Sequence, residues 1–277
     1  MRARFWANPD LTMNCYISPL TCPKDALEGD VMMPPMLRRG RYQARFAETE
    51  SDVQAAQALR HRCFGRPGDG GGLDRDAFDA LCHHVLVEEI RTGQLVCCFR
   101  LLPLAGGAEI GDSYSAQYYE LSALEAFDGP MVEMGRFCIA PDQRDADILR
   151  VAWGAMTRFV DRHGVEMLFG CSSFAGTEAA EYLDTFDMLA ERHLAPSRWI
   201  PRVKAPKVFS FAGLRGGDGK AGLKRMPPLL RTYLAMGGWV SDHAVVDEHM
   251  NTLHVFTGLE IRAIPAARAR ALRAVAG

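Results

Sequence analysis

The sequence lacks the features that would assign it at once to several common classes of protein. Its 32 lysines and arginines nearly balance 34 aspartates and glutamates, so no strong positive field favours nucleic acid as a partner. No stretch approaches the roughly 18 apolar residues that a membrane-spanning helix needs, and the N-terminus lacks the apolar core of a secretory signal. We therefore expect a cytoplasmic protein, with peripheral contact at the inner membrane left open.

Motifs for metals and nucleotides are also absent. The eight cysteines are scattered, none forms a CxxC pair, and Cys82-His83-His84 has no second ligand pair at zinc spacing. The glycines of residues 65–73 are not followed by the GKS or GKT of a phosphate-binding loop. Reduced cysteines and no bound metal are therefore expected.

The hydrophobic pattern predicts a mixed α/β fold. Apolar runs at 84–88 and 95–102 flank a short turn and predict a β-hairpin. Runs at 131–139 and 165–171, each followed by a helical pattern, predict a βαβα unit with parallel strands. Further strands are expected at 42–47 and 255–259, and helices at 50–64, 113–127, 147–163, 176–189, 227–236 and 266–275.

The predicted elements form one domain after an extension. Residues 41–277 contain no firm internal boundary, so we expect a single domain whose mixed central sheet is flanked by helices. Residues 1–40 carry several prolines and methionines without clear periodicity, and we expect them to form an N-terminal extension.

Residues 131–150 are the stretch on which the chemistry depends. Glu133 lies in an apolar strand, where a carboxylate is a candidate base. Arg136 follows three residues later, and residues three apart face opposite sides of a regular strand. A bulge at Gly135 would bring both onto one face and would free backbone amides for a thioester or pantetheine.

Arg100 lies in a neighbouring apolar strand, where an unpaired charge would be costly to bury. It therefore needs a carboxylate, and Asp76 or Asp79 could supply it. The same residues could form a buried ion-pair network that only fixes the packing, and the residues alone leave both interpretations open.

The turn before the longest amphipathic helix is a candidate anion site. Arg144 beside free N-terminal amides favours a phosphate such as that of phosphopantetheine. Asp145 and Asp147 could instead be capping residues. The predicted site for the acyl carrier and its pantetheine comprises Gln143, Arg144, Asp145, Ala146 and Asp147.

Several further side chains carry weaker signals for chemistry or binding. Cys138 or Cys171 could form an acyl-cysteine intermediate, and His83 or His84 could act as a base. The basic segment 198–225 could dock an acidic carrier protein or anionic lipid, or could simply be solvated. The apolar side chains of 229–234 could contact a membrane surface or pack in the core.

Several motifs in order resemble the acyl-homoserine-lactone synthases, namely RxxxF at 60–64, DxxD at 76–79, CFRLLP at 98–103 and ExxRF at 133–137. The resemblance to bacterial L-ornithine Nα-acyltransferases is closer. It rests on AQALRHRCF at 56–64, DRDAFDALCHHVLV at 74–87, LFGCSSFAGTE at 168–178 and LKRMPPLLRTYLAMGGWVSDHAVVD at 223–247. It covers residues 41–264 and implies a GNAT-like fold.

The resemblance implies an enzyme that moves a (3-hydroxy)acyl chain from acyl carrier protein to the α-amine of L-ornithine, giving lyso-ornithine lipid. It implies Glu133 as general base, with Arg100 and Arg136 also in the catalytic group. The implied substrate-binding residues are Arg60, Phe64, Asp76, Asp79 and Phe137. An amino acid's α-amine is mostly protonated at pH 7, so a base must take its proton before it attacks a thioester. The acyl-carrier thioester is a co-substrate, and no metal or redox cofactor is implied.

The acceptor and the class of protein stay open to more than one interpretation. Glutamine or another amino acid could replace ornithine, or S-adenosylmethionine could be the acceptor of a homoserine-lactone synthase. A sensor or scaffold could keep the GNAT fold without transfer. A cationic acceptor side chain would need a carboxylate, and the sequence does not choose among Asp74, Asp76, Asp79, Glu88 and Asp112.

Overall fold

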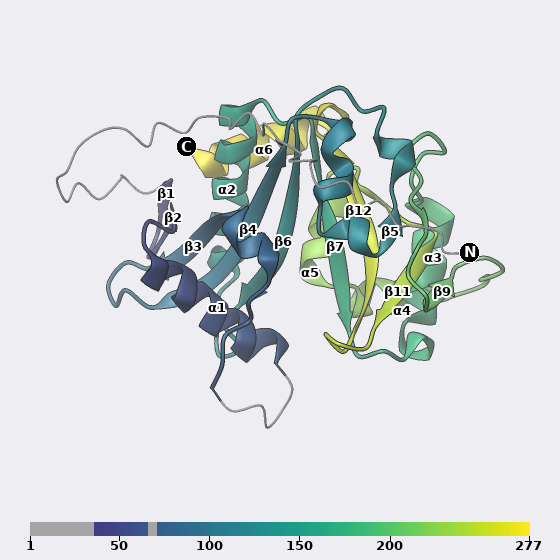
Figure 1. Cartoon of the computed structure of the whole chain (residues 1–277), viewed down its shortest axis with the longest axis horizontal. Coiled ribbons are helices and arrows are strands. Elements are labelled where there is room, and N and C mark those ends of the chain that lie inside the picture. The colour runs from purple at the N-terminus through teal and green to yellow at the C-terminus, as the bar shows by residue number, and fades with distance from the viewer. Residues whose placement is uncertain (1–35, 66–70) are drawn as a thin grey trace, which may run out of the picture. The chain divides into compact units, whose positions relative to one another are not determined.

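The computed structural model describes residues 36–65 and 71–277, and within them ten strands form one sheet (Figure 1). The predicted hairpin is confirmed as the antiparallel pair of β3 and β4. The central neighbours β6 and β7 are parallel, as the βαβα pattern predicted, and the remaining pairs of this sheet are antiparallel. The strand order is β1 (Leu37–Arg39), β2 (Tyr42–Phe46), β3 (His83–Glu89), β4 (Leu95–Leu104), β6 (Met131–Ile139), β7 (Met167–Ala175), β12 (Thr252–Glu260), β11 (His243–Asp247) and β9 (Val208–Ser210), with β10 (Trp239–Val240) paired to β12.

Helices cover both faces of the sheet. Helix α1 (Glu50–Phe64) packs on Leu86 and Cys98, whereas α2 (Ala146–His163) packs on the opposite face against the alternate residues of the same strands. This division follows from the period of two that a strand imposes on its side chains. The other helices are α3 (Leu183–Arg192), α4 (Gly219–Arg225), α5 (Pro228–Ala235) and α6 (Ala266–Ala276).

Local signals explain where α2 begins and ends. The Asp145 carboxylate accepts a hydrogen bond of 2.9 Å from the Asp147 N–H, which satisfies a free donor at the helix start. Gly164 ends the helix with φ of 59°, a left-handed conformation that glycine adopts without strain. The helix therefore follows its predicted span closely.

The strands β6 and β7 pair only along their first residues. Met131–Glu133 pair with Met167–Phe169, after which the strands separate (Figure 1). At Gly170, where separation begins, an added Cβ would lie 2.4 Å from the Met134 carbonyl oxygen, so the close approach requires glycine. Past this point, neither strand satisfies the other's backbone groups.

The bulge that Gly135 would permit is present in β6. Cys98 lies opposite Cys138 and Arg100 lies opposite Gly135, so two residues of β6 face only Phe99 of β4. The first of the two, Arg136, has φ of 52°, which is uncommon for a residue with a side chain and costs free energy. The bulge interrupts the alternation of side chains beyond Gly135.

Two segments differ from the predictions. The helix expected at 113–127 is instead two short 3-10 turns, Ser115–Gln117 and Ser122–Leu124, around β5 (Tyr119–Glu120), which pairs with β8 (Arg202–Val203). The Tyr114 and Ser115 N–H groups at the start of this segment donate to the Glu133 carboxylate. The helix expected from 176 begins only at Leu183, after another 3-10 turn.

The described residues also bear on the N-terminal extension. Residues 1–35 of the predicted extension lie outside the described residues, whereas Leu37–Arg39 form β1 at the edge of the sheet. None of the described helices is both long and apolar enough to cross a membrane.

Candidate active site

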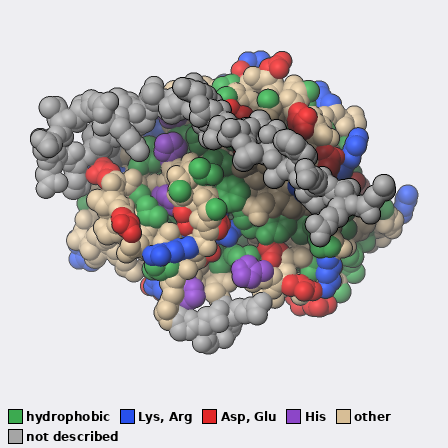
Figure 2. All heavy atoms as spheres, in the orientation of Figure 1, with side chains coloured by type: hydrophobic (Ala, Val, Ile, Leu, Met, Phe, Trp, Pro, Cys, Tyr) green, Lys and Arg blue, Asp and Glu red, His purple; other side chains and the backbone are tan. Residues whose placement is uncertain are grey.

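A cavity of about 330 Å³ is lined by the separating strands β6 and β7. Its other walls come from the β11–β12 hairpin and from the start of α5. Hydrophobic side chains gather near the centre of the face that Figure 2 shows. The lining has an apolar portion that includes Phe64, Phe137, Ile139, Leu149 and Leu229, and a polar portion formed by Arg100, Glu133, Arg136, Asp247 and His254.

Glu133 is buried and faces this cavity. Its Oε2 accepts a 2.7 Å hydrogen bond from the Tyr114 N–H, and its Oε1 accepts bonds of 2.8 and 2.5 Å from the Ser115 N–H and Oγ–H. Burial raises the pKa of Glu133, while the hydrogen bonds from Ser115 and Tyr114 reduce that rise. A carboxylate with a raised pKa is a stronger proton acceptor, which suits a general base.

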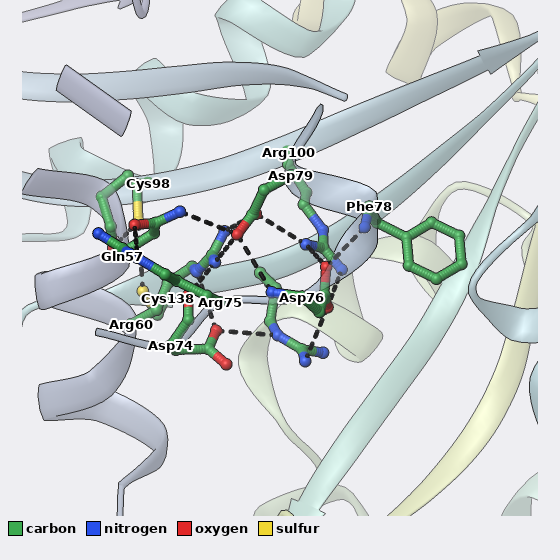
Figure 3. Close-up of polar contacts among 12 residues, drawn as sticks. Gln57, Arg60, Asp74, Arg75, Asp76, Phe78, Asp79, Cys98, Arg100 and Cys138 are labelled. Atoms are coloured by element: carbon green, nitrogen blue, oxygen red, sulfur yellow. Dashed lines mark hydrogen bonds and ion pairs between the residues drawn. The ribbon is translucent and has the colours of Figure 1, made fainter. Parts of the chain in front are cut away.

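Arg100 lines the same cavity, so Glu133 and this arginine face a common space. Figure 3 shows Arg100, Asp76 and Asp79 turned toward one another. Arg100 donates to both oxygens of Asp76, at 2.6 and 2.7 Å, and to Asp79 at 2.9 Å. The arginine is 2% exposed, and this bidentate contact supplies the carboxylate that its burial requires.

Two further arginines complete the network. Arg60 donates to both oxygens of Asp79, at 2.8 and 2.9 Å, and Arg136 donates to Asp74 at 3.0 Å and to Asp76 at 3.2 Å. Burial alone would raise the pKa of Asp76 and Asp79, but the arginines outweigh it and hold both pKa values below their ordinary range. Three guanidinium groups and three carboxylates thus form a balanced ion-pair network.

The structure separates the predicted substrate-binding residues into two groups. Phe64 and Phe137 line the cavity together with the three predicted catalytic residues. Arg60, Asp76 and Asp79 lie in the network behind the lining, where their partners are Arg100 and Arg136. The contact of these three residues with substrate stays a prediction. Their hydrogen bonds within the network are observed, and Asp76 and Asp79 bind the guanidinium group of Arg100.

The predicted pantetheine segment lies at the start of α2 and does not line the 330 Å³ cavity. Asp145 caps the helix and also accepts a 3.0 Å hydrogen bond from the Tyr42 hydroxyl. Arg144 donates to the carbonyl oxygens of Pro141 and Gln143, at 2.8 and 3.1 Å, and Asp147 pairs with Arg150. Asp145 therefore has the capping role, while the pantetheine role of Gln143 to Asp147 stays a prediction.

Neither candidate cysteine nucleophile is activated. Burial, together with the charge of neighbouring Glu133, raises the pKa of Cys171 to about 12. Hydrogen bonds with Cys63 and Cys98 raise the pKa of Cys138 well above its ordinary value, and burial adds to this rise. Both side chains are therefore thiols at neutral pH, and a thiol is a poor nucleophile.

The candidate histidine bases do not line the cavity, and two of the candidate membrane-contact residues are buried in the core. His84 contacts the Asp79 carbonyl oxygen at 3.0 Å, and neither His84 nor His83 lines the cavity. Leu230 and Tyr233 are buried in the core, which favours packing over membrane contact for these two. Across 36–65 and 71–277, no three His, Cys, Asp or Glu side chains are grouped as metal ligands would be.

Sequence reasoning missed Asp247 and His254 as lining residues. Asp247 ends the apolar run of β11, and His254 lies in β12, so each is a lone polar residue in a β-strand pattern. The only available signal was their position in apolar strands, since the contact between His254 and Tyr119 joins residues 135 positions apart. None of the five carboxylates that the sequence offers for a cationic acceptor lines the cavity.

Comparison with known proteins is consistent with this geometry. Residues 57–154 match the acetyltransferase (GNAT) domain family. The chain is 32% identical to the L-ornithine N(alpha)-acyltransferase of Rhodobacter capsulatus, over 80% of this chain and 91% of that protein. It is 29% identical to the protein of the same name from Brucella abortus, over 86% of this chain and 90% of that protein.

Solved structures with a similar chain path include the acyl-homoserine-lactone synthase LasI, with a TM-score of 0.36 and 16% identity over 78% of this chain and 89% of that one. They also include the N-acyl amino acid synthase FeeM from uncultured soil microbes, with a TM-score of 0.43 and 10% identity over 85% and 97% of the two chains.

The GNAT domain and the mixed sheet around a lined cavity define an acyltransferase, which uses an acyl donor and an amino-acid acceptor. The chain belongs to the L-ornithine N(alpha)-acyltransferase family. The family that the sequence motifs resembled is thereby confirmed.

Proposed function

We propose that this enzyme transfers a (3-hydroxy)acyl chain from acyl carrier protein to the α-amine of L-ornithine and forms lyso-ornithine lipid. The observation that carries the proposal is the buried Glu133, which faces a cavity that is apolar on one side and charged on the other. An acyl chain needs the first kind of surface and an amino acid needs the second. The names of the relatives support ornithine as the acceptor.

The reaction begins when Glu133 takes a proton from the α-ammonium group of the acceptor. The free amine attacks the thioester carbon, so that a C–N bond forms and the carbonyl oxygen becomes an oxyanion. The separated edges of β6 and β7 offer backbone N–H groups for that oxyanion. When the oxyanion collapses, the C–S bond breaks, and the new amide nitrogen gives its second proton to the leaving thiolate. Glu133 then releases the first proton to solvent, which restores the base.

The arginines assist without taking part in proton transfer. Arg100 and Arg136 both line the cavity, where their positive charge favours the acceptor's α-carboxylate and the developing oxyanion. The Asp74, Asp76 and Asp79 carboxylates hold the two guanidinium groups in place. Since the thioester is already activated, the proposed reaction uses no metal or redox cofactor.

The apolar wall is the proposed site of the acyl chain. Phe137 and Ile139 of β6 face it together with Leu229 at the start of α5. A saturated chain that leaves water for such a wall gains roughly 0.8 kcal/mol per buried methylene group. We place the reaction in the cytoplasm, and the lipid product then passes to the inner membrane.

The experiment is an assay of purified protein with 3-hydroxyacyl carrier protein and single acceptors, read by mass spectrometry. We expect acyl-ornithine as the main product. Equal acylation of glutamine or another neutral amino acid would refute ornithine specificity. A lactone formed only with S-adenosylmethionine would replace the proposal with a homoserine-lactone synthase.

A further inference from the structure

The Asp247 carboxylate is a buried charge on the wall of the cavity. Asp247 is the last residue of β11 and pairs in register with Thr252 of β12, and both residues line the cavity. Only 6% of Asp247 is exposed. The side chain is therefore held at the cavity by the β11–β12 hairpin, which lies on the side of β7 away from β4 and Arg100.

The protein supplies little to compensate this charge. Asp247 Oδ1 accepts one hydrogen bond of 2.9 Å, from the Met250 N–H. Within the described part of the chain, no lysine, arginine or histidine forms an ion pair with it. A buried carboxylate with one backbone donor and no cation is costly, so its presence at a cavity indicates a cationic ligand.

The neighbouring imidazole does not neutralise Asp247. The Tyr119 hydroxyl donates to the His254 carbonyl oxygen at 2.8 Å and lies 3.1 Å from Nδ1, so Nδ1–H donates to that hydroxyl. His254 Nε2 is buried and has no hydrogen-bond partner among the described residues. Burial lowers the pKa of His254 to about 4, so the ring is neutral at pH 7.

The other carboxylates at the cavity lining and in the network behind it are compensated by the protein, and Glu133 among them is assigned to the α-amine. Asp74, Asp76 and Asp79 are paired with arginines, and Glu133 accepts three hydrogen bonds. Among the described carboxylates that line the cavity, Asp247 is thus the one left without either a cation or several donors.

Glu133 and Asp247 act on a common neighbour from β7. Cys171 lines the cavity with both carboxylates, and its Sγ lies 3.4 Å from the Ser115 hydroxyl that donates to Glu133. The charges of both carboxylates raise the pKa of the Cys171 thiol. A diamino acid could therefore direct one ammonium group to each carboxylate in the same cavity. Ornithine has this arrangement of charges, whereas glutamine and norvaline have no second ammonium group.

We propose that Asp247 binds the side-chain ammonium group of the amino-acid acceptor and thereby selects ornithine over neutral amino acids. This inference rests on the proposed function, because it assumes that the α-amine reacts near Glu133. Asp247 is then a specificity-determining residue, and Glu133 remains the base.

The test compares wild type with Asp247→Asn, which removes the charge and keeps an oxygen that can accept from the Met250 N–H. We expect the KM for ornithine to rise about thirtyfold or more, as for a broken buried charge pair, while kcat/KM for norvaline stays within about threefold. Asp112→Asn is the matched control, since this exposed residue does not line the cavity and should leave both constants unchanged.

An Asp247→Asn enzyme with wild-type preference for ornithine over norvaline would overturn the inference. If that variant does not fold, Asp247→Glu provides a second test, because its longer side chain should shift preference toward the shorter 2,4-diaminobutyrate. An unchanged order of preference would again overturn it. Failure of the wild type to acylate ornithine would instead refute the proposed function, so the two failures are distinct.

Discussion

The two charged sides of the cavity differ in how their charges are compensated. On the β4 side, three arginines and three aspartates pair with one another, and Arg100 and Arg60 are almost fully buried. On the β11–β12 side, Asp247 has no cation and His254 Nε2 has no partner within the described residues. The charges on the first side compensate one another without a ligand. The Asp247 charge on the second side would be compensated only by a bound cation.

This difference indicates that the β4 side stabilises the cavity wall, whereas the β11–β12 side binds the ligand. A paired buried charge keeps a wall rigid, since moving it would break several charge-assisted hydrogen bonds. An unpaired buried charge destabilises the empty protein and so favours whatever cation enters. Mutations on the two sides should therefore have opposite effects on stability.

The largest expected effect on stability is that of Arg100→Ala. This change leaves Asp76 without its bidentate partner and Asp79 with one arginine fewer, so unfolding should become easier by about 3 to 5 kcal/mol. Urea denaturation measures it. Arg198→Ala is the control, because Arg198 pairs with Glu260 at the surface, and its loss should cost about 1 kcal/mol or less. Equal losses in the two variants would contradict the comparison.

The matched aspartates provide a sharper contrast. Asp76→Asn should destabilise the protein by a few kcal/mol, because it leaves a buried arginine without full compensation. Asp247→Asn should instead raise the free energy of unfolding by about 1 kcal/mol in the absence of substrate. Denaturation of both variants without amino acid tests this. A marked loss of stability in Asp247→Asn would show that its charge supports the fold.

The smallest expected effect is on the pH dependence of stability. The folded state lowers the pKa of Asp76 and Asp79, so their stabilisation is complete above an ordinary carboxyl pKa near 4 and is lost as pH falls below it. Burial raises the pKa of Glu133, so its contribution declines as pH rises above the ordinary glutamate value. Glu133→Gln should remove only the second trend. Denaturation curves from pH 3 to pH 8 measure both, and an unchanged profile above pH 4 would contradict the assignment for Glu133.

The sequence was sufficient to predict much of the fold and one side of the cavity. The hairpin and the parallel β6 and β7 followed from local pattern, and Gly135 marked a position where a bulge was possible. Arg100 and its aspartate partners followed from the cost of burying an unpaired charge.

The rest depended on contacts that no local pattern encodes. The segment 113–127 forms short turns, and its Tyr114 and Ser115 N–H groups bond to Glu133, which lies 19 and 18 positions away. The sequence could not distinguish Asp247 from other carboxylates at strand ends. What sets Asp247 apart is that no cationic side chain among the described residues pairs with it. Pairing can be inferred from charge and hydrophobicity, but a missing partner is visible only in three dimensions.

The most direct test of the proposed mechanism is the rate of acyl transfer to ornithine by Glu133→Gln. Glutamine keeps the size of the side chain and removes its capacity to take a proton, so we expect the rate to fall by about 100-fold to 10,000-fold. Circular dichroism should show that the variant is folded. A folded variant that forms acyl-ornithine at the wild-type rate would contradict the role of Glu133 as the base.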